Sequence, residues 1–557
     1  MIIPCNALPF RRHALALALA FAVGAAHATS INVNADCSLF NAINNANTDT
    51  DTDGVNGCPA GSGADILNLP LNSTQSLNNG LPAITSIITI NGNGSTVDGL
   101  GNRPFNISTA GDLTLNRLTV KNGRYAQRGG GIQNLGKLTM VNSTVTDNGT
   151  YWEGDSYLGA YGVYGGGIFN AGTATLTNST VANNLIDVGF TFYGVRSGLG
   201  GGIFNSGSMT LTNSRVSNNK TLGSSSLHGQ GPSSGGGIIN YGVMALNNTT
   251  VSGNSAATDG GGIRNRGIMA LDGSTVSGNS ADNGGGINNG SGHFIGSNSI
   301  SLTLTNSTVS GNSAFSGGGI RNAKNLTLIN TTLSGNRAAG IVNSGNLTLI
   351  NSLIANSRPA NSDCLNGSGA IVIAQGINLV EDGSCGADIS GDPKLGALLN
   401  NGGTTATHAL LSGSDALDFA IKKYCPATDQ RGVKRPQPFA GNCDLGAFEG
   451  MTTVPSVVKS VVDFFDNAII SGGIVGTGWT GQNSLVIQRS NALHNQLLGA
   501  GHYKSRGLGA EACAQLRRTL DRIDPNNTPD ANDYVTGNEA GTLTEKLKAL
   551  RVAWTCK

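Results

Sequence analysis

The chain has 557 residues and a formal net charge of +1, and only 12% of its residues are charged, against about 25% in typical soluble proteins. A chain with so few charges is not a charge-driven disordered tail. Its near-neutral balance argues against nucleic acid or an anionic membrane as the main partner, because both select basic surfaces. The 83 glycines are roughly twice the usual share, which favours one elongated repeat body over several globular domains.

Residues 1–28 have the pattern of a secretory signal peptide. Arg11 and Arg12 precede an apolar run from Ala14 to Ala26, and small residues follow up to Ala28. No later stretch approaches about 20 consecutive apolar residues. We therefore expect a secreted or cell-surface monomer with no integral membrane segment once the signal is removed.

Eight cysteines remain after Cys5 leaves with the signal peptide. An even number in an exported chain favours disulfides over metal, and none of the cysteines has CxxC spacing. The simplest expectation is four local pairs taken in chain order: Cys37 with Cys58, Cys364 with Cys385, Cys425 with Cys443, and Cys513 with Cys556.

A short glycine-rich unit repeats along residues 65–391. The segment GGGI, first seen at Gly129, is followed by a strand-like element such as LTLTNSTVSGN, and the step between them is 13 residues in seven of eight repeats. Repeats of this length suit one β-coil each and are too short for two packed helices. The sequence therefore predicts an all-β fold, a right-handed parallel β-helix.

Period-two alternation predicts which side chains face the interior of the coils. One inward column runs from Met140 to Leu349, a second from Leu138 to Leu347 and a third from Val145 to Ile354, with threonines between them facing solvent. Asparagines that recur at coil ends are expected to form hydrogen-bonded ladders between coils. We expect the asparagines of the NST and NTT sequons to act mainly as ladder residues, with glycan attachment as the alternative.

The ends of the rod need covers, since an open coil leaves backbone groups unpaired. Leu39, Ala42, Ile43 and Ala46 share one face of a short amphipathic helix that would cap the first end within residues 29–64. After Gly450 the composition changes and three segments have helical periodicity, so residues 450–557 are predicted to form a small helical domain.

Two segments resemble domains of bacterial exported proteins. The run from Cys37 to Ile43, CSLFNAI, followed by GCPAGSGADIL, resembles the CSLREA-type N-terminal domain, with Phe40 and Asn41 in place of that motif's Arg and Glu. Residues 392–449, with DQRGVKRPQ and CDLGAFE, resemble the choice-of-anchor Q domain. The repeats resemble those of polymorphic outer membrane proteins and the pectate-lyase-like superfamily, and NALHNQL and AGTLTEKL resemble FIMAH-type modules.

These resemblances imply an exported β-helix, but the architecture hosts adhesins, lyases and hydrolases alike.

Three consecutive gaps between repeats are 18 or 19 residues long, so their loops should stack into one raised wall. Exposed aromatic rings beside polar groups suit sugars, although the same rings could instead pack on each other to order the loops. The candidate ligand-binding residues are Trp152, Glu153, Asp155, Tyr157, Tyr161, Tyr164, Asp187, Phe190, Phe192, Tyr193 and Arg196, together with Phe169 and Phe204, which follow two of the long loops on one outward stripe.

A non-enzymatic protein that binds a polysaccharide or a cell-surface glycan, adhesin-like, is the preferred interpretation. A pectate-lyase-like enzyme needs carboxylates that hold Ca²⁺, yet the outward stripe that contains Arg264 and Arg321 has no Asp or Glu. A glycoside hydrolase needs two facing carboxylates, for which only Glu153, Asp155 and Asp187 are candidates. We therefore predict no catalytic residues, and a polysaccharide lyase, a glycoside hydrolase and a purely structural spacer remain the alternatives.

The only cofactor that the sequence suggests is Ca²⁺. Asp49, Asp51 and Asp53 form the D-x-D-x-D-G start of a calcium loop, but Ala60 stands where the bidentate Glu is expected. A weak extracellular Ca²⁺ site and a simple acidic turn are both consistent with this pattern.

Overall fold

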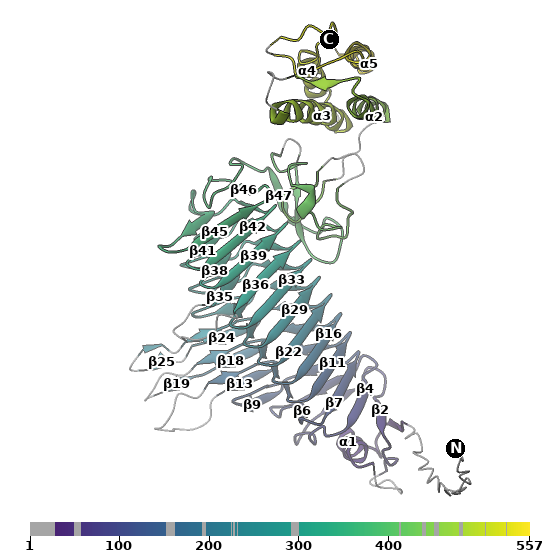
Figure 1. Ribbon diagram of the computed structural model, residues 1–557. Coiled ribbons are helices and arrows are strands. Elements are labelled where there is room, and N and C mark those ends of the chain that lie inside the picture. The colour runs from purple at the N-terminus through teal and green to yellow at the C-terminus, as the bar shows by residue number, and fades with distance from the viewer. Residues whose placement is uncertain are drawn as a thin grey trace, which may run out of the picture.

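The computed structural model describes residues 28–49, 57–151, 162–191, 197–223, 225–226, 229–230, 232–290, 300–411, 414–436, 442–450, 456–477, 483–506, 508–530 and 532–556. In this part of the chain, stacked coils form a right-handed parallel β-helix, as the sequence predicts (Figure 1). The predicted signal peptide lies outside the described residues up to position 27.

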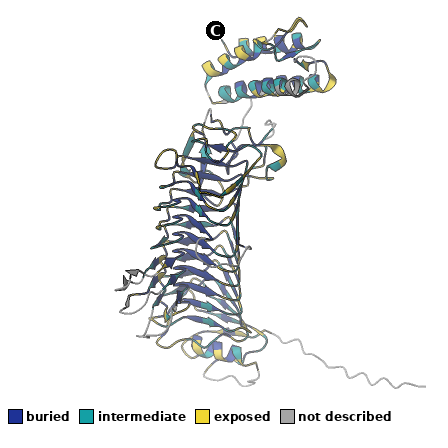
Figure 2. Ribbon diagram, turned by 60° about the vertical axis from the view of Figure 1, so that its left-hand side comes forward, coloured by how far each residue is buried: buried dark blue, intermediate teal, exposed yellow. Residues whose placement is uncertain are grey.

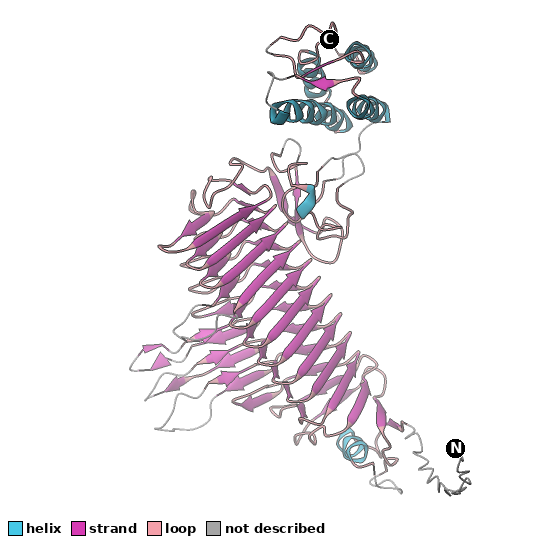
Figure 3. Cartoon of the chain, viewed as in Figure 1, coloured by secondary structure: helices cyan, strands magenta, loops and turns pink. Residues whose placement is uncertain are grey.

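Three long parallel sheets, A, B and C, form the sides of the rod (Figure 3). Sheet A consists of β1 (Ser30–Asn32), β2 (Ala64–Asn68), β4 (Ile87–Asn91), β7 (Asp112–Asn116), β11 (Lys137–Val141), β16 (Thr173–Thr177), β22 (Ser208–Thr212), β29 (Val243–Asn247), β33 (Ile268–Asp272), β36 (Ser301–Thr305), β39 (Asn325–Ile329), β42 (Asn346–Ile350) and β45 (Ile371–Gln375). Sheet B consists of β3 (Thr74–Ser76), β5 (Thr96–Asp98), β8 (Thr119–Lys121), β12 (Thr144–Thr146), β17 (Thr180–Ala182), β23 (Arg215–Ser217), β30 (Thr250–Ser252), β34 (Thr275–Ser277), β37 (Thr308–Ser310), β40 (Thr332–Ser334), β43 (Leu353–Ala355) and β46 (Leu379–Val380). Sheet C consists of β6 (Phe105–Ile107), β10 (Ile132–Asn134), β15 (Ile168–Asn170), β21 (Ile203–Asn205), β28 (Ile238–Asn240), β32 (Ile263–Asn265), β35 (Ile287–Asn289), β38 (Ile320–Asn322), β41 (Ile341–Asn343) and β44 (Cys364–Asn366).

Shorter sheets lie on the side of the rod that carries the long loops. Sheet D consists of β9 (Arg124–Ala126), β13 (Gly149–Tyr151), β18 (Leu185–Asp187), β24 (Lys220–Leu222) and β31 (Ser255–Ala256). Two small sheets extend from it: β14 (Val163–Tyr164), β20 (Gly198–Leu199) and β27 (Ser233–Ser234) form one, and β19 (Phe190–Thr191), β25 (Ser225–Ser226) and β26 (Gly229–Gln230) form the other.

The core of the rod is the set of side chains that point inward from sheets A, B and C. Much of the ribbon of these sheets is coloured as buried in Figure 2. All members of the three predicted inward columns are buried, none more than 1% exposed. Equivalent residues pair directly across neighbouring strands, as Leu138 does with Ala174 and Val145 with Val181. Apolar side chains therefore stack on similar side chains from coil to coil, which confirms the predicted columns.

Two asparagine ladders run inside the corners of the coils. In one, the Nδ2 of each asparagine donates to the Oδ1 of the next at 2.9–3.0 Å, through Asn148, Asn184, Asn219, Asn254, Asn279, Asn312 and Asn336. The other ladder runs through Asn134, Asn170, Asn205, Asn240, Asn265, Asn289, Asn322, Asn343 and Asn366. Since buried amides need partners, each coil satisfies the polar groups of its neighbour.

The sequon asparagines have a different role from the predicted one. Asn142, Asn178 and Asn248 occupy left-handed turns between sheets A and B, at φ of 49–50°, and their side chains are exposed. The next residue forms the contact between coils, as where the backbone N of Ser143 donates to Ser179 Oγ at 3.2 Å. Asparagine suits these turns because it tolerates the left-handed region better than most side chains. The expectation that these residues are ladder members was wrong.

The GGG runs are explained by close approach of the coils. The first glycine of each run has a positive φ, 62° at Gly165, which favours glycine. A Cβ on the second would collide with the next coil, since at Gly201 it would lie 2.4 Å from the carbonyl oxygen of Gly236. The third packs on the asparagine ladder, so the repeat needs all three.

Helix α1 (Leu39–Asn47) covers the first end of the rod. Its predicted face of Leu39, Ala42, Ile43 and Ala46 is buried, and Cys37 and Cys58 form a disulfide beside it. Strand β1 lies in the predicted cap yet pairs with β2 in sheet A, so the rod begins before residue 65. Cap and rod share one core.

Residues 392–450, which we call the flap, fold back along the last coils. They contain the hairpin β47 (Leu395–Leu399) and β48 (Thr407–Leu410) and the 3-10 helix η1 (Lys422–Tyr424). The flap bonds to the turns between sheets A and B: Thr405 Oγ1 donates to the Gly273 carbonyl oxygen at 2.7 Å, and Asn351 Nδ2 donates to the Ile421 carbonyl oxygen at 3.1 Å.

The C-terminal unit is helical, as predicted. It contains α2 (Ser456–Ser471), α3 (Asn483–Ser505), α4 (Gly509–Leu520) and α5 (Ala540–Ala553), with β49 (Val475–Gly476) and β50 (Val535–Thr536) paired beside them. The helices bury a separate apolar core. All four predicted disulfides are present, including Cys364–Cys385, Cys425–Cys443 and Cys513–Cys556. Among the described residues, no helix combines the length and apolarity needed to span a membrane.

Replacing one ladder asparagine should destabilise the rod. Asn219→Ala removes the partner of Asn184 Nδ2 and of the Asn254 carboxamide, so we expect a loss of about 3 kcal/mol in the free energy of unfolding, measured by chemical denaturation. The neighbouring Asn218→Gly is the control, because Gly253 holds the same turn one coil later. Equal effects of the two substitutions would contradict a stabilising ladder.

Candidate functional site

Sheet D, on the side of the rod that carries the long loops, has a gap in its outer surface. Successive strands place one outward residue per coil in an unbroken register column: Arg124, Gly149, Leu185, Lys220, Ser255, Ser280, Ser313, Arg337 and Arg358. Gly149 has no side chain, so it leaves a notch between Arg124 and Leu185. A cleft of about 410 Å³ lies at this notch.

The cleft is lined by residues of four successive coils, and its lining is both polar and apolar. Its charged and amide-bearing lining comes from the turns and strands between sheets B and D: Asn122, Arg124, Asp147, Asn148, Asn183 and Asp187. Asp147 Oδ2 accepts a hydrogen bond from Thr146 Oγ1 at 2.8 Å, and Asp187 Oδ1 accepts one from the Gly189 backbone N at 3.0 Å. These bonds orient the two carboxylates, which are natural acceptors for sugar hydroxyls.

Arginines lie on aromatic rings beside this cleft. The Arg124 guanidinium lies 5.0 Å from the centre of the Tyr151 ring, and Tyr151 pairs in register with Asp187. The Arg103 guanidinium lies 3.5 Å from the centre of the Tyr125 ring. Such cation–π contacts hold both partners in place.

Two charged residues beside the cleft, Arg103 and Asp98, have pKa values that their surroundings shift. Burial lowers the pKa of Arg103 to about 10, so this residue stays charged at neutral pH. Burial alone would raise the pKa of Asp98, but hydrogen bonds from Asn122 and the charge of Lys121 hold it below its ordinary value. Lys121 Nζ lies 3.4 Å from Asp98 Oδ2.

Three of the predicted aromatic residues form a cluster of their own. Phe169 and Phe204 lie on the predicted outward stripe and pair directly in register, but they are only 6% and 7% exposed. Their rings stack with centres 5.1 Å apart, and the Tyr164 ring meets Phe204 edge-on at 4.9 Å. For these residues the structure favours the packing alternative over direct contact with a sugar.

Of the other predicted residues, only Asp187 is placed in the cleft. The structure describes the backbone of Phe190 in β19 but not its side chain. Trp152, Glu153, Asp155, Tyr157, Tyr161, Phe192, Tyr193 and Arg196 lie outside the described residues. The same holds for Asp51 and Asp53, and Asp49 lies exposed in the turn after α1. Within the described residues, no group of three His, Cys, Asp or Glu side chains could hold a metal ion.

Arg103, Arg124, Tyr125 and Asp147 lie in or beside the cleft but were not among the residues predicted from the sequence. Arg124 and Tyr125 belong to the run RYAQR, two arginines and a tyrosine in a chain with few charges, which directly precedes the first GGGI. This local basic and aromatic composition was the available signal. The RYAQR run lies just before the long loops, whose aromatic residues were predicted to bind the ligand.

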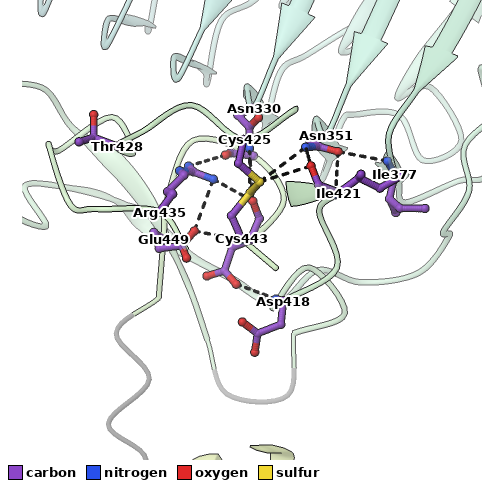
Figure 4. The surroundings of a disulfide bond; sticks show 12 residues. Asn330, Asn351, Ile377, Asp418, Ile421, Cys425, Thr428, Arg435, Cys443 and Glu449 are labelled. Carbon is purple, nitrogen blue, oxygen red and sulfur yellow. Dashed lines mark hydrogen bonds and ion pairs between the residues drawn. A yellow bond between two sulfur atoms is a disulfide. The ribbon is translucent and has the colours of Figure 1, made fainter. Parts of the chain in front are cut away.

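A second group of polar side chains is buried where the flap meets the rod, close to the Cys425–Cys443 disulfide (Figure 4). The Arg435 side chain is fully buried, and its Nη1 donates to the Asp444 carbonyl oxygen at 2.8 Å and lies 3.5 Å from Glu449 Oε2. Asp444 Oδ1 accepts from the Asp418 backbone N at 2.7 Å. The Arg431 Nη2 lies 2.6 Å from Asp429 Oδ2, and both side chains are buried.

The pKa values of two carboxyls in this flap cluster are raised toward neutrality. Burial raises the pKa of Asp444 to about 7, and the charge of Asp418 adds to this effect. Burial also raises the pKa of Asp418 to about 7, with a further contribution from Glu449. Burial lowers the pKa of Arg435, but Glu449 and the neighbouring aspartates oppose that shift. The contacts connect the flap's own segments, so we assign the cluster a structural role.

The packing of the flap's segments against one another should weaken as pH rises. A carboxyl whose pKa is higher in the folded state stabilises it fully below the unfolded pKa, and this contribution is lost as pH rises through about 7. We expect hydrogen exchange of flap amides such as Gly446 to quicken beyond its intrinsic pH dependence between about pH 4 and 7, by the equivalent of about 2 kcal/mol. Asp418→Asn should flatten this profile and the exposed Asp415→Asn should not. Identical profiles for all three proteins would rule out the cluster as the cause.

Comparison of the chain with protein-family models, with curated proteins and with solved structures finds no match. The class of the protein is therefore defined by its fold, a disulfide-bonded right-handed parallel β-helix. The resemblances to CSLREA, choice-of-anchor Q and FIMAH-type domains stay predictions from the quoted motifs.

Proposed function

We propose that this protein is an exported, non-enzymatic β-helix that binds carbohydrate or a glycan-coated surface through the cleft on sheet D. Four disulfides are consistent with an extracellular location. We also propose that the protein is secreted or attached to the cell surface, and that it is a monomer.

The observation that carries the proposal is the composition of the cleft. Asp147, Asp187 and Arg124 offer acceptors and donors for sugar hydroxyls, and the Tyr151 ring is adjacent in the sheet. Protein sites for sugars combine a few fixed polar groups with an aromatic surface that meets the apolar C–H face of the ring. Because the cleft spans four coils, it also suits an extended chain better than a compact small molecule.

Filling the notch should abolish binding without unfolding the rod. Gly149 has no positive φ, and a Cβ there would meet only the Leu185 carbonyl oxygen, at 3.1 Å. Gly149→Leu should therefore lower signals on a glycan array at least tenfold, while the free energy of unfolding changes by less than about 1 kcal/mol. Ser280→Leu places the same side chain in the same column four coils away and should bind as wild type.

An array on which the wild-type protein binds no glycan would contradict the proposal and favour a structural spacer. So would binding that Gly149→Leu leaves intact, since the cleft would then not be the site.

A glycoside hydrolase is the second candidate, because Asp147 and Asp187 border the same cleft and such enzymes use paired carboxylates. Under our proposal, wild-type protein releases no reducing ends from any polysaccharide that it binds. Release that Asp187→Asn abolishes would replace the binding function with hydrolysis. Release of unsaturated sugars in the presence of Ca²⁺ would indicate a lyase instead.

A further inference from the structure

A group of basic and aromatic side chains lies on and beside β9, the first strand of sheet D. We call Arg103, Arg124, Tyr125 and Arg128 the arginine ledge. Strand β9 is the terminal strand of this sheet, pairing within it only with β13. The ledge therefore borders the cleft on one side and ends the sheet on the other.

The geometry of the ledge presents both charge and an open ring. Arg103 is fixed by its Nε, which donates to the Gly129 carbonyl oxygen at 2.9 Å, and by its Nη2, which donates to the Arg128 carbonyl oxygen at 2.6 Å. Its guanidinium lies over the Tyr125 ring, yet Tyr125 is still 47% exposed. Arg124 and Arg128 are exposed. A planar group could thus meet the tyrosine ring while anions reach the arginines.

The charge of the ledge is not neutralised locally. Among the described residues, none of its three arginines forms an ion pair, whereas nearby Lys121 and Lys137 are paired with Asp98 and Asp112. The ledge thus brings three arginines together in a chain of which only 12% of residues are charged. The closest carboxylates of the cleft, Asp147 and Asp187, lie on the coils that follow.

We propose that the arginine ledge binds the carboxylate groups of an acidic polysaccharide, an inference that rests on the carbohydrate-binding function proposed above. The guanidinium fork matches a carboxylate with two parallel hydrogen bonds. A sugar ring can stack on the exposed Tyr125, and hydroxyls of the following sugars can reach Asp147 and Asp187 in the cleft. A nucleic acid fits less well, because it selects strongly basic surfaces and the whole chain has a formal net charge of only +1.

The test compares one polymer with and without its charge. Binding of the full-length protein to immobilised alginate is measured beside binding to the neutral propylene glycol ester of alginate. We expect at least tenfold higher affinity for the charged form, and a decline with added salt. The double variant Arg124→Gln, Arg128→Gln should lose that preference, because two of the charges that would bind the carboxylates are removed. Both side chains are exposed, so we expect the variant to fold.

The control is Arg337→Gln. Arg337 is exposed and lies in the same register column as Arg124, so it removes an equivalent charge from a coil far from the ledge. It should bind alginate as the wild type does. If Arg337→Gln weakens binding as much as the double variant, the effect is one of net charge and the ledge is not the site.

The outcomes separate this inference from the function on which it rests. Equal binding to alginate and its ester, unchanged by the double variant, overturns the ledge but leaves carbohydrate binding in place. If the protein binds neither alginate nor its ester, nor any glycan on the array, both the ledge inference and the carbohydrate-binding function are overturned. Binding to double-stranded DNA as tight as to alginate would assign the ledge to nucleic acid instead.

Discussion

The in-register hydrogen bonding of one coil to the next is the constraint on which this molecule depends. Each backbone N–H of the long sheets finds its carbonyl on a neighbouring coil, and each corner amide of the asparagine ladders does the same. Because a buried amide without a partner is costly, every coil must present the same group at the same place. The repeated GGGI and SGN segments are the sequence form of that requirement, and the flat stacked sheets are its structural form.

Most of the fold could be predicted from the sequence for this reason. Strict repetition exposes both the period of the coil and the alternation within each strand, so the inward columns, the capping face of α1 and all four disulfides were predicted residue by residue. The sequon asparagines were misassigned because a ladder and a left-handed turn both select asparagine. Only the backbone angle distinguishes Asn142, which is in a turn, from Asn148, which is in a ladder.

The candidate site could be predicted less well, because it depends on what is missing from a column. The sequence draws attention to aromatic residues, and two of these, Phe169 and Phe204, bury their rings against each other. The cleft instead arises where Gly149 interrupts a column of side chains, and a glycine in a chain with 83 of them carries no visible signal. The flap cluster was also beyond reach, since pairing Arg435 with Glu449 requires knowing how the flap folds.

The flap forms hydrogen bonds with the coils between the turns at Gly273 and Asn351. The cleft and sheet D belong to earlier coils, between Gly99 and Ala256. Each coil contacts mainly the coils directly before and after it, so the cleft and the flap depend on different coils. The number of coils between the cleft and the flap therefore sets the distance that separates them. Adding or removing one whole coil would move the cleft relative to the flap by about 4.8 Å and leave the contacts of both unchanged. Distance along the rod is thus a quantity that evolution can alter one unit at a time.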